Sequence, residues 1–506
     1  MMPPEQCCGS PSHFTFRRLY EAWLDCRRKK RGRRPTLRFE QDSETHLIDL
    51  SRELTAWAYQ PSPSFCFIAR NDKHREIFAA EFRDRVVHHL LVRELEKIWE
   101  PIFIHDSYAC RKNRGTHAAV KRIQTFTRRA TANGTCRAWF AQLDIEAFFP
   151  SIDRRRLLEI VLAKLKDAEL RWLAEVLILH EPSVAPVFTC SPEKWRGVPP
   201  HKSLFTVSPG KGLPIGNLTS QFFANVYLNS LDQFIKHTLK AQWYVRYVDD
   251  LIFVHENPHR LREWVEAVSR FLGEHLVLNL NSKRCRVSPV SNGINAFGYV
   301  TRPSHLLVRR RTVQRCREAL HRGTKGMIGQ FPAIENIPGS SRPLLRFSPS
   351  RQESLRATFQ SYLGLFGHAA SGKLVASLFL RSPILSWLFR LDDTRLIRRW
   401  HLPFRPGNFW TQWRFFRERF RGLILTRVGC FWEMFDRDAV RYAESLGLRR
   451  IQPRPGFYAR CGISLNRMKS FLNRLRGLNT AILWVDQTGR FVGTRQERCA
   501  VASIIG

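Results

Sequence analysis

The sequence predicts an α+β fold distributed over several domains, because its 506 residues fall into stretches with different patterns. Residues 60–305 alternate short strand-like runs with helical ones, as mixed domains do. Residues 306–400 have a helical pattern, and the segment 401–410, which contains Pro and Gly, is typical of a linker. Residues 411–506 show a strand–helix–helix–strand order of their own, so we expect a separate α/β domain there.

A basic helical extension is expected over residues 1–59. Residues 14–57 have a helical pattern that is interrupted by seven cations among the eight residues 27–34. Such a run is either a solvated, flexible link or an arm that contacts phosphates, and the sequence leaves both interpretations open.

The charge balance of the chain indicates a polyanionic partner. Lysine and arginine number 82 against 44 aspartates and glutamates, so the formal net charge is +38. Neutralised phosphates release counterions and thereby drive binding, which makes nucleic acid the expected partner. The 43% of hydrophobic residues excludes a mainly disordered chain.

The composition also argues against a membrane span, secretion and a zinc site. No apolar run reaches the ~18 residues of a membrane span, since Arg381 interrupts the best candidate, residues 374–389. The N-terminus does not read as a secretory leader, and the 12 cysteines include no C-x-x-C pair. We therefore expect a cytoplasmic protein, encoded by a bacterium, an archaeon or a phage, with reduced thiols.

Three segments carry the residues that could perform chemistry. The first is an apolar strand-like run that ends at Asp144. The second has two β-rich runs flanking Asp249 and Asp250, which is typical of a tight hairpin. The third, residues 211–225, is a glycine-rich loop that runs into a helix.

Nucleotidyl transfer explains why aspartates would be arranged in this way. Two Mg²⁺ ions about 4 Å apart activate the attacking hydroxyl and stabilise the leaving pyrophosphate, and Mn²⁺ could substitute for them. Mg²⁺ prefers hard oxygen ligands. An aspartate at a strand end and an aspartate pair at a neighbouring hairpin tip can converge on such ions, so we expect Asp144 to lie within chelating reach of Asp249.

The order and spacing of these segments, within a basic chain, resemble those of a reverse transcriptase. The stretch at Asp144 looks like the first catalytic motif of that family, and residues 247–250 look like its Y-x-D-D hairpin. Residues 297–299 follow where a later palm motif would lie. The resemblance covers about residues 14–370. It implies a right-hand polymerase, with fingers and palm in the mixed domain and a helical thumb over residues 306–400.

Within that family the chain most resembles the reverse transcriptases of diversity-generating retroelements. The supporting stretches are residues 82–89, 106–111, 115–119 and above all 215–221, where Ile and Ser-Gln replace the Gln and Ser-Pro of most reverse transcriptases. This resemblance implies error-prone copying of a template RNA, particularly at adenines. A phage-defence reverse transcriptase and a catalytically inactive nucleic-acid-binding protein are the alternatives.

The resemblance assigns catalytic roles to individual residues. Asp144 and Asp249 would bind both metal ions. Ile145 would contribute its backbone carbonyl, and Asp250 would assist. Phe149 would lie under the sugar and exclude a 2′-hydroxyl, although a phenylalanine in this position could equally be a core residue.

Further residues would contact the nucleotide. Ile215 and Gly216 would touch the nascent base pair, and the apolar Ile215 cannot hydrogen-bond as glutamine can, which loosens the check on pair geometry. Arg75 and Arg85 suit the oxygens of a triphosphate, unless they form surface or interhelical salt bridges. The other nucleotide-binding candidates are Gln221, Tyr247 and Lys283.

The C-terminal domain has expected elements of its own. An apolar strand enters an aromatic and acidic bend over residues 423–435, and helices are expected over residues 437–446 and 466–478. Strands over residues 481–485 and 499–505 close the domain.

This order resembles the mismatch-recognition domain, domain I, of MutS proteins. The resemblance implies that Phe431 wedges between bases, at an unstacking cost of the order of a few kcal/mol, and that Glu433 hydrogen-bonds a base. Cys430 stands where that family has an acidic residue, and the chain has no P-loop, so the MutS ATPase is absent. The alternative is that Phe431 is a core residue and that the domain binds duplex generally or docks a protein.

The predicted reaction is RNA-templated DNA synthesis, in which a primer 3′-hydroxyl attacks the α-phosphate of a dNTP. The expected partners are a template RNA, a DNA primer or target, and dNTPs. Proteins of this type usually work with a small basic accessory protein, and the fused C-terminal domain could substitute for one.

Overall fold

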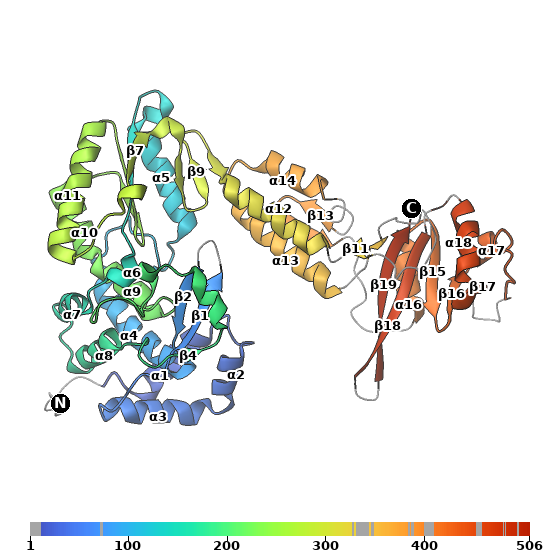
Figure 1. Cartoon of the computed structure of the whole chain (residues 1–506), viewed down its shortest axis with the longest axis horizontal. Coiled ribbons are helices and arrows are strands. Elements are labelled where there is room, and N and C mark those ends of the chain that lie inside the picture. The colour runs from blue at the N-terminus through green and yellow to red at the C-terminus, as the bar shows by residue number, and fades with distance from the viewer. Residues whose placement is uncertain are drawn as a thin grey trace. The chain divides into compact units, whose positions relative to one another are not determined.

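The computed structural model describes residues 12–70, 74–325, 328–329, 344–345, 349–382, 385, 389–398, 409–451, 458–478, 480, 482–492 and 495–505. The chain divides after Leu306 into two compact units, Met1–Leu306 and Leu307–Gly506 (Figure 1). Most of the segment that we expected to be a linker, residues 401–408, lies outside the described part of the chain.

The first unit begins with three helices, of which the first two pack against α4 and the third packs against the first two. They are α1 (Phe16–Arg27), α2 (Arg34–Gln41) and α3 (Ser43–Thr55), and α4 spans Phe82–Trp99. Their apolar residues belong to the largest hydrophobic core of the unit. Residues 28–34, between α1 and α2, are exposed. The N-terminal helices are therefore part of the first unit, and the basic run faces solvent.

A four-stranded antiparallel sheet forms the centre of the first unit. Its order is β5-β6-β3-β7, with bounds Tyr244–Tyr247, Asp250–His255, Trp139–Asp144 and Arg286–Pro289. Helix α11 (Pro258–Leu276) and helix α5 (Thr116–Ala130) both pack against it. Leu251 lies in the core that contains α11, whereas Ile252 lies in the cluster that contains α5. Because successive side chains point to opposite covered faces, β6 is apolar along its middle.

A second sheet and several short elements complete this unit. The antiparallel hairpin of β1 (Phe65–Arg70) and β2 (His74–Ala79) is extended in parallel by β4 (Val187–Phe188). The remaining helices and strands are α6 (Phe148–Ser151), α7 (Arg154–Leu162), α8 (Ala168–Leu179), α9 (Leu218–Tyr227), α10 (Asn229–Gln233), β8 (Ile294–Ala296) and β9 (Tyr299–Thr301). The mixed helix and strand content expected for residues 60–305 is confirmed.

The second unit opens with helices and a hairpin. After β10 (Leu306–Val308), α12 (Arg310–Lys325) and α13 (Pro349–Phe366) pack together, and α14 (Gly372–Leu380) follows. The hairpin of β13 (Phe389–Asp392) and β14 (Arg395–Arg398) was not predicted within the helical stretch. Its turn residue Asp393 has φ +48, a left-handed conformation that aspartate tolerates better than most residues. Two further short strands are β11 (Ile328–Gly329) and β12 (Leu344–Leu345).

A five-stranded sheet forms the C-terminal part of the second unit. Its order is β17-β16-β15-β18-β19, with bounds Arg460–Ser464, Phe431–Phe435, Leu423–Val428, Ile482–Val492 and Arg495–Ile505. Strands β15 and β18 are parallel, and the other neighbours are antiparallel. Its helices are α16 (Phe409–Arg419), α17 (Arg437–Tyr442) and α18 (Met468–Gly477).

The expected elements of this part are present with shifted ends. Helix α17 ends four residues before the predicted residue 446, because the chain turns toward Gly447, which has φ +63. Strands β18 and β19 are longer than predicted, since they pair with each other along their whole length.

Two absences hold for the described residues. None of their helices combines the length and apolar character that a membrane span needs. The nine cysteines whose side chains the structure describes are free thiols.

Candidate active site

The predicted acidic hairpin is the β5–β6 connection. Tyr247 and Asp250 are cross-strand partners, so Val248 and Asp249 form a two-residue turn. Val248 has φ +54, as a primed turn requires. A β-branched residue is unfavourable in this conformation, so surrounding contacts must hold the turn.

The three candidate metal ligands meet at one end of the central sheet. Asp144 is the last residue of β3 and the cross-strand partner of Asp250. The backbone N–H of Ile145 donates to the carbonyl of Asp249 at 3.3 Å. The aspartates are half-buried. The backbone therefore places Asp144, Asp249 and Asp250 at the same end of the sheet.

The carboxylate of Asp144 is bound by a cation of the chain itself. Nη1 of Arg284 lies 3.3 and 3.2 Å from its two oxygens, and Nδ2 of Asn281 donates to Oδ2 at 3.3 Å. Among the described residues, no three or more His, Cys, Asp or Glu side chains are gathered to hold a metal ion. The carboxylate oxygens of these aspartates are hard ligands of the kind that a divalent cation prefers. In this structure the Asp144 side chain instead contacts the guanidinium of Arg284.

The glycine-rich loop lies against β2. The N–H of Phe78 donates to the carbonyl of Ile215 at 2.9 Å. Gly216 has φ +132, and a Cβ atom there would lie 2.9 Å from Cγ2 of Ile77 and 3.0 Å from the carbonyl oxygen of Phe78. Glycine is thus the residue that this close approach allows. Ile215 is half-buried, and Gly216 is exposed.

Phe149 lies in α6, next to the same loop. Its carbonyl accepts a hydrogen bond from the N–H of Leu213 at 2.9 Å, and Gly212 donates to the carbonyl of Ile152 at 2.8 Å. The Phe149 ring is half-buried, with its centroid 5.4 Å from that of Phe148. The structure therefore ties the candidate sugar gate to the glycine-rich loop.

The other nucleotide-binding candidates differ in their contacts and in their exposure. Nε of Arg85 donates to the carbonyl of Ala80 at 2.7 Å, so this arginine has a local contact at the start of α4. Arg75, on β2, is exposed, and so are Gln221 and Lys283.

Tyr247 packs beside the acidic turn. Its ring centroid lies 4.8 Å from that of Phe297, and its hydroxyl lies 3.1 Å from Oγ1 of Thr116. Phe297 belongs to the later motif that the sequence indicated, so that motif contacts the hairpin.

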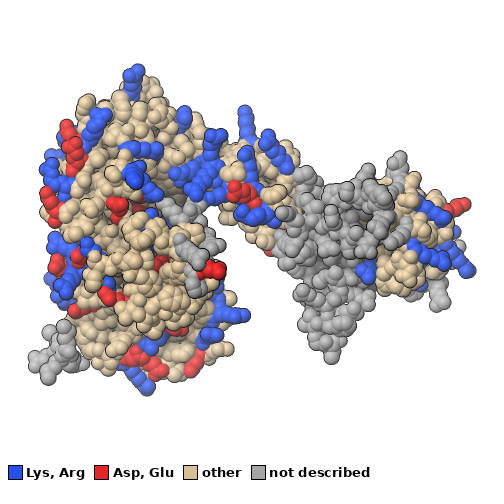
Figure 2. Space-filling model, in the orientation of Figure 1, with Lys and Arg blue, Asp and Glu red and all other residues tan. Residues whose placement is uncertain are grey.

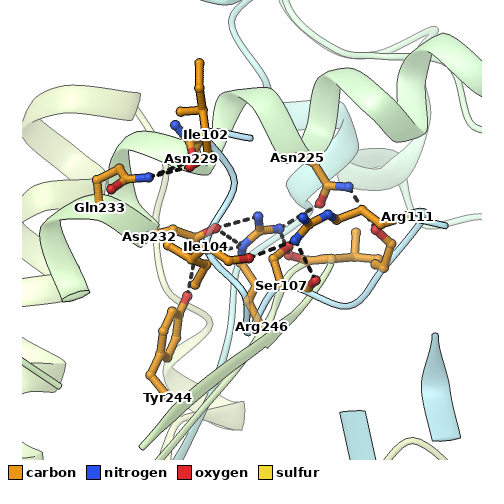
Figure 3. A network of polar contacts seen from close by, with 12 residues as sticks. Ile102, Ile104, Ser107, Arg111, Asn225, Asn229, Asp232, Gln233, Tyr244 and Arg246 are labelled. Atoms are coloured by element: carbon orange, nitrogen blue, oxygen red, sulfur yellow. Dashed lines mark hydrogen bonds and ion pairs between the residues drawn. The ribbon is translucent and has the colours of Figure 1, made fainter. Parts of the chain in front are cut away.

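A buried ion pair behind the hairpin was not singled out from the sequence. Arg246 of β5 and Asp232 of α10 are both fully buried, with Nη2 and Oδ2 2.7 Å apart (Figure 3). The signal in the sequence was a charged residue inside the apolar strand β5. A lone arginine in a strand is usually an edge or surface residue. The burial of Arg246 could be predicted only together with its partner Asp232, which lies 14 residues away in the sequence.

In the C-terminal sheet, Phe431 begins β16 and is 41% exposed, whereas its neighbour Trp432 is buried. The alternative that Phe431 is a core residue is therefore wrong. Glu433 is the cross-strand partner of Gly462, where a Cβ atom would lie 3.0 Å from its Cγ. Burial raises the pKa of Glu433, and Arg460 partly offsets this rise.

Basic side chains are spread over the visible described surface of both units (Figure 2). Helix α12 exposes Arg310, Arg311, Arg317 and Arg322. A surface of this charge is suited to phosphates.

Two segments of the chain match known protein families. Residues 67–301 match the family described as reverse transcriptase (RNA-dependent DNA polymerase). The chain contains a reverse transcriptase domain. The aspartates at the end of the central sheet lie within this domain. The enzyme class of the domain is RNA-directed DNA polymerase. Residues 408–496 match MutS domain I.

Three curated relatives are 24–29% identical to the chain over the residues that align. Protein YkfC of Escherichia coli is 24% identical over 298 residues, which cover 52% of this chain and 71% of that protein. The group II intron-encoded protein LtrA of Lactococcus lactis is 28% identical over 196 residues, 38% of this chain and 28% of LtrA. An uncharacterized 91 kDa protein in the cob intron of Schizosaccharomyces pombe is 29% identical over 161 residues, 32% of this chain and 17% of that protein. The chain thus matches less than a third of the length of the last two.

Solved structures with some likeness include two telomerases. Apo telomerase from Candida tropicalis, truncated from its C-terminal domain, has a TM-score of 0.36 and 13% identity over 53% of this chain and 60% of that chain. Telomerase from Candida albicans, in complex with a TWJ fragment of telomeric RNA, has a TM-score of 0.35 and 11% identity over 63% and 55%.

Proposed function

We propose that the chain copies a template RNA into DNA at the junction of β3, β5 and β6, as the polymerase of a diversity-generating retroelement. The observation that carries the proposal is the backbone juxtaposition of Asp144, Asp249 and Asp250 inside a reverse transcriptase domain. The reaction joins a primer 3′-hydroxyl to the α-phosphate of a dNTP and releases pyrophosphate.

The three aspartates and the carbonyl of Ile145 are the groups that would hold Mg²⁺. Two bound ions supply Lewis-acid activation of the hydroxyl and stabilise the charge of the leaving group. The two-residue turn keeps Asp249 and Asp250 at the tip of a rigid hairpin, which limits the conformational freedom that binding would remove. Arg284 pairs with Asp144 in this structure, and a bound divalent ion would supply the same positive charge.

The residues around the aspartates would select and orient the nucleotide. Phe149 carries a bulky ring on a helix tied to the glycine-rich loop, and this fits a steric block against a 2′-hydroxyl. Ile215 and Gly216 would contact the nascent pair, with the triphosphate held by exposed Arg75 and Lys283. Because Arg85 is bound to Ala80, it would act by fixing the start of α4.

Error-prone copying is proposed from the apolar Ile215. Its side chain has no hydrogen-bonding group, so it cannot test the geometry of a base pair through a polar contact. Its backbone is fixed by Phe78, which leaves the side chain as the variable element of the loop.

The fingers, palm and thumb of a right-hand polymerase are the proposed arrangement. Exposed arginines on α12 would track the phosphates of a template–primer duplex. The MutS domain I-like part would bind duplex DNA, with Phe431 as an exposed wedge and Glu433 beside it. A small basic accessory protein is a further proposed partner.

Sequencing of DNA made in vitro tests this function. Full-length protein, Mg²⁺, dNTPs and a DNA primer on a defined RNA template should give cDNA with errors concentrated at template adenines. The absence of any extension on RNA would contradict the polymerase activity. Accurate copying at adenines would contradict the retroelement role and favour the phage-defence alternative.

A further inference from the structure

The side chain of Arg246 points from β5 into the first unit, where each of its three nitrogens has a hydrogen-bond partner. Its Nε lies 2.9 Å from both oxygens of Asp232, and Nη2 lies 2.7 Å from Oδ2 (Figure 3). The hydroxyl of Tyr244 donates to the same carboxylate at 2.8 Å. Arg246, Asp232 and Tyr244 each have no exposed surface. This buried network therefore fixes the guanidinium in one orientation.

The remaining nitrogen of that guanidinium reaches the acidic turn. Nη1 of Arg246 donates to the carbonyl oxygen of Val248 at 3.2 Å and to Oδ1 of Asn225 at 3.0 Å. Asn225, on α9, in turn donates to the carbonyl of Ala109 at 2.8 Å. Arg246 thus links the turn of the hairpin to the helix that follows the glycine-rich loop.

The backbone of Arg246 is held from its other side. Its N–H donates to the carbonyl of Asp106, and its carbonyl accepts from the N–H of Tyr108, each at 3.0 Å. Strand β5 is therefore bonded along both edges just before the turn, and the turn residue Val248 is the first that has left-handed backbone geometry. The hydrogen bond to its carbonyl is one of the contacts that surround this unfavourable φ.

We propose that Arg246, oriented by Asp232, is a positioning residue that holds the Val248 turn and so aims the carboxylates of Asp249 and Asp250. The inference rests on the proposed metal-binding role of these aspartates. A buried ion pair can instead serve the fold alone, and replacing such a pair by apolar residues is often neutral or stabilising. Stability and positioning can therefore be separated experimentally.

The first variant is Arg246→Lys. A lysine keeps the charge beside Asp232 but cannot donate to Asp232, Asn225 and Val248 at once. We expect the Mg²⁺ concentration for half-maximal primer extension to rise about tenfold, the equivalent of one lost hydrogen bond. Two readouts do not depend on activity: Mn²⁺ binding followed by electron paramagnetic resonance should weaken similarly, and amide hydrogen exchange over residues 247–250 should accelerate.

The second variant removes the network as a unit, with Asp232→Leu, Tyr244→Phe and Arg246→Met combined. We expect it to unfold at the wild-type temperature or above, yet to keep the weakened Mn²⁺ binding and fast exchange of Arg246→Lys. If its Mn²⁺ binding and exchange return to wild-type values along with stability, the pair serves only the fold and the proposal is overturned.

Arg417→Lys is the matched control in the second unit. Arg417 also forms a largely buried pair with an aspartate, Asp438 at 2.7 Å, and donates to the backbone carbonyls of Phe420 and Gly422. Arg417→Lys should lower stability without changing Mn²⁺ binding. If it weakened Mn²⁺ binding as much as Arg246→Lys does, the proposal would be overturned. If the wild type binds Mn²⁺ but incorporates no dNTP, the proposed function fails, and the binding and exchange data still decide the role of Arg246.

Discussion

Asp144 and Asp250 are cross-strand partners at the ends of β3 and β6, with Asp249 bonded through its carbonyl to the residue that follows Asp144. Acidic groups so close together repel one another unless a cation lies among them. In this chain Arg284 provides that charge for Asp144. If Asp144 binds a divalent ion as proposed, that ion would compete with the guanidinium for one carboxylate.

Removal of this competitor should ease metal binding. The Arg284 side chain is 45% exposed, so its pair with Asp144 contributes about 0–1 kcal/mol. We expect Arg284→Gln to lower the Mg²⁺ concentration for half-maximal extension by about two- to fivefold. Arg286 is a nearby exposed arginine that donates to Gln142. Arg286→Gln removes the same charge and should leave the Mg²⁺ concentration for half-maximal extension unchanged. A higher Mg²⁺ requirement in Arg284→Gln would show that the arginine assists the site.

Phe149 should discriminate between sugars. In Phe149→Ala, the ratio of kcat/KM for an rNTP to that for the matching dNTP should rise by about 10- to 100-fold, because space opens where a 2′-hydroxyl would lie. Single-nucleotide extension gives this ratio. Thermal unfolding of the same variant is the control, since a Phe149 that only fills the core would lower stability and leave the ratio unaltered.

Phe431 should carry any preference for mispaired duplex. The wild type is expected to bind a mispaired duplex more tightly than a matched one at fixed salt, and Phe431→Ala should reduce that preference about tenfold. Val440→Ala is the matched control, because Val440 is 55% exposed on α17 of the same domain. Equal affinity of the wild type for both duplexes would leave general duplex binding or protein docking as the role.

Glu433 should make stability depend on pH. Burial raises its pKa above the ordinary value of 4.5, so the folded state retains the proton to higher pH than the unfolded state. Its contribution to stability is therefore largest at low pH and is lost as pH rises from about 4.5 through the raised pKa. Thermal unfolding should show Glu433→Gln gaining stability over the wild type at neutral pH. Glu444→Gln, at an exposed position, should show no such gain.

The sequence allowed the backbone of the site to be predicted, because strand periodicity and turn composition are local. Asp144 was predicted at a strand end, and Asp249 and Asp250 at a hairpin, and the structure has them there. The Arg284–Asp144 contact spans 140 residues, and the Arg246–Asp232 pair joins a strand to a helix, so neither has a local signal. These contacts follow from tertiary packing.

The helical stretch over residues 306–400 shows the same limit. The hairpin of β13 and β14 has only four residues in each strand, too few to establish a period-two pattern against a helical background.

The most direct test of the account is primer extension by Asp249→Asn. This change keeps the size of the side chain and removes the charge that would hold a metal ion, so dNTP incorporation on an RNA template should fall by about a thousandfold or more. Asp393→Asn, an exposed aspartate in the turn of the other hairpin, should extend primers like the wild type. Undiminished incorporation by Asp249→Asn would contradict the assignment of the active site to the end of β3, β5 and β6.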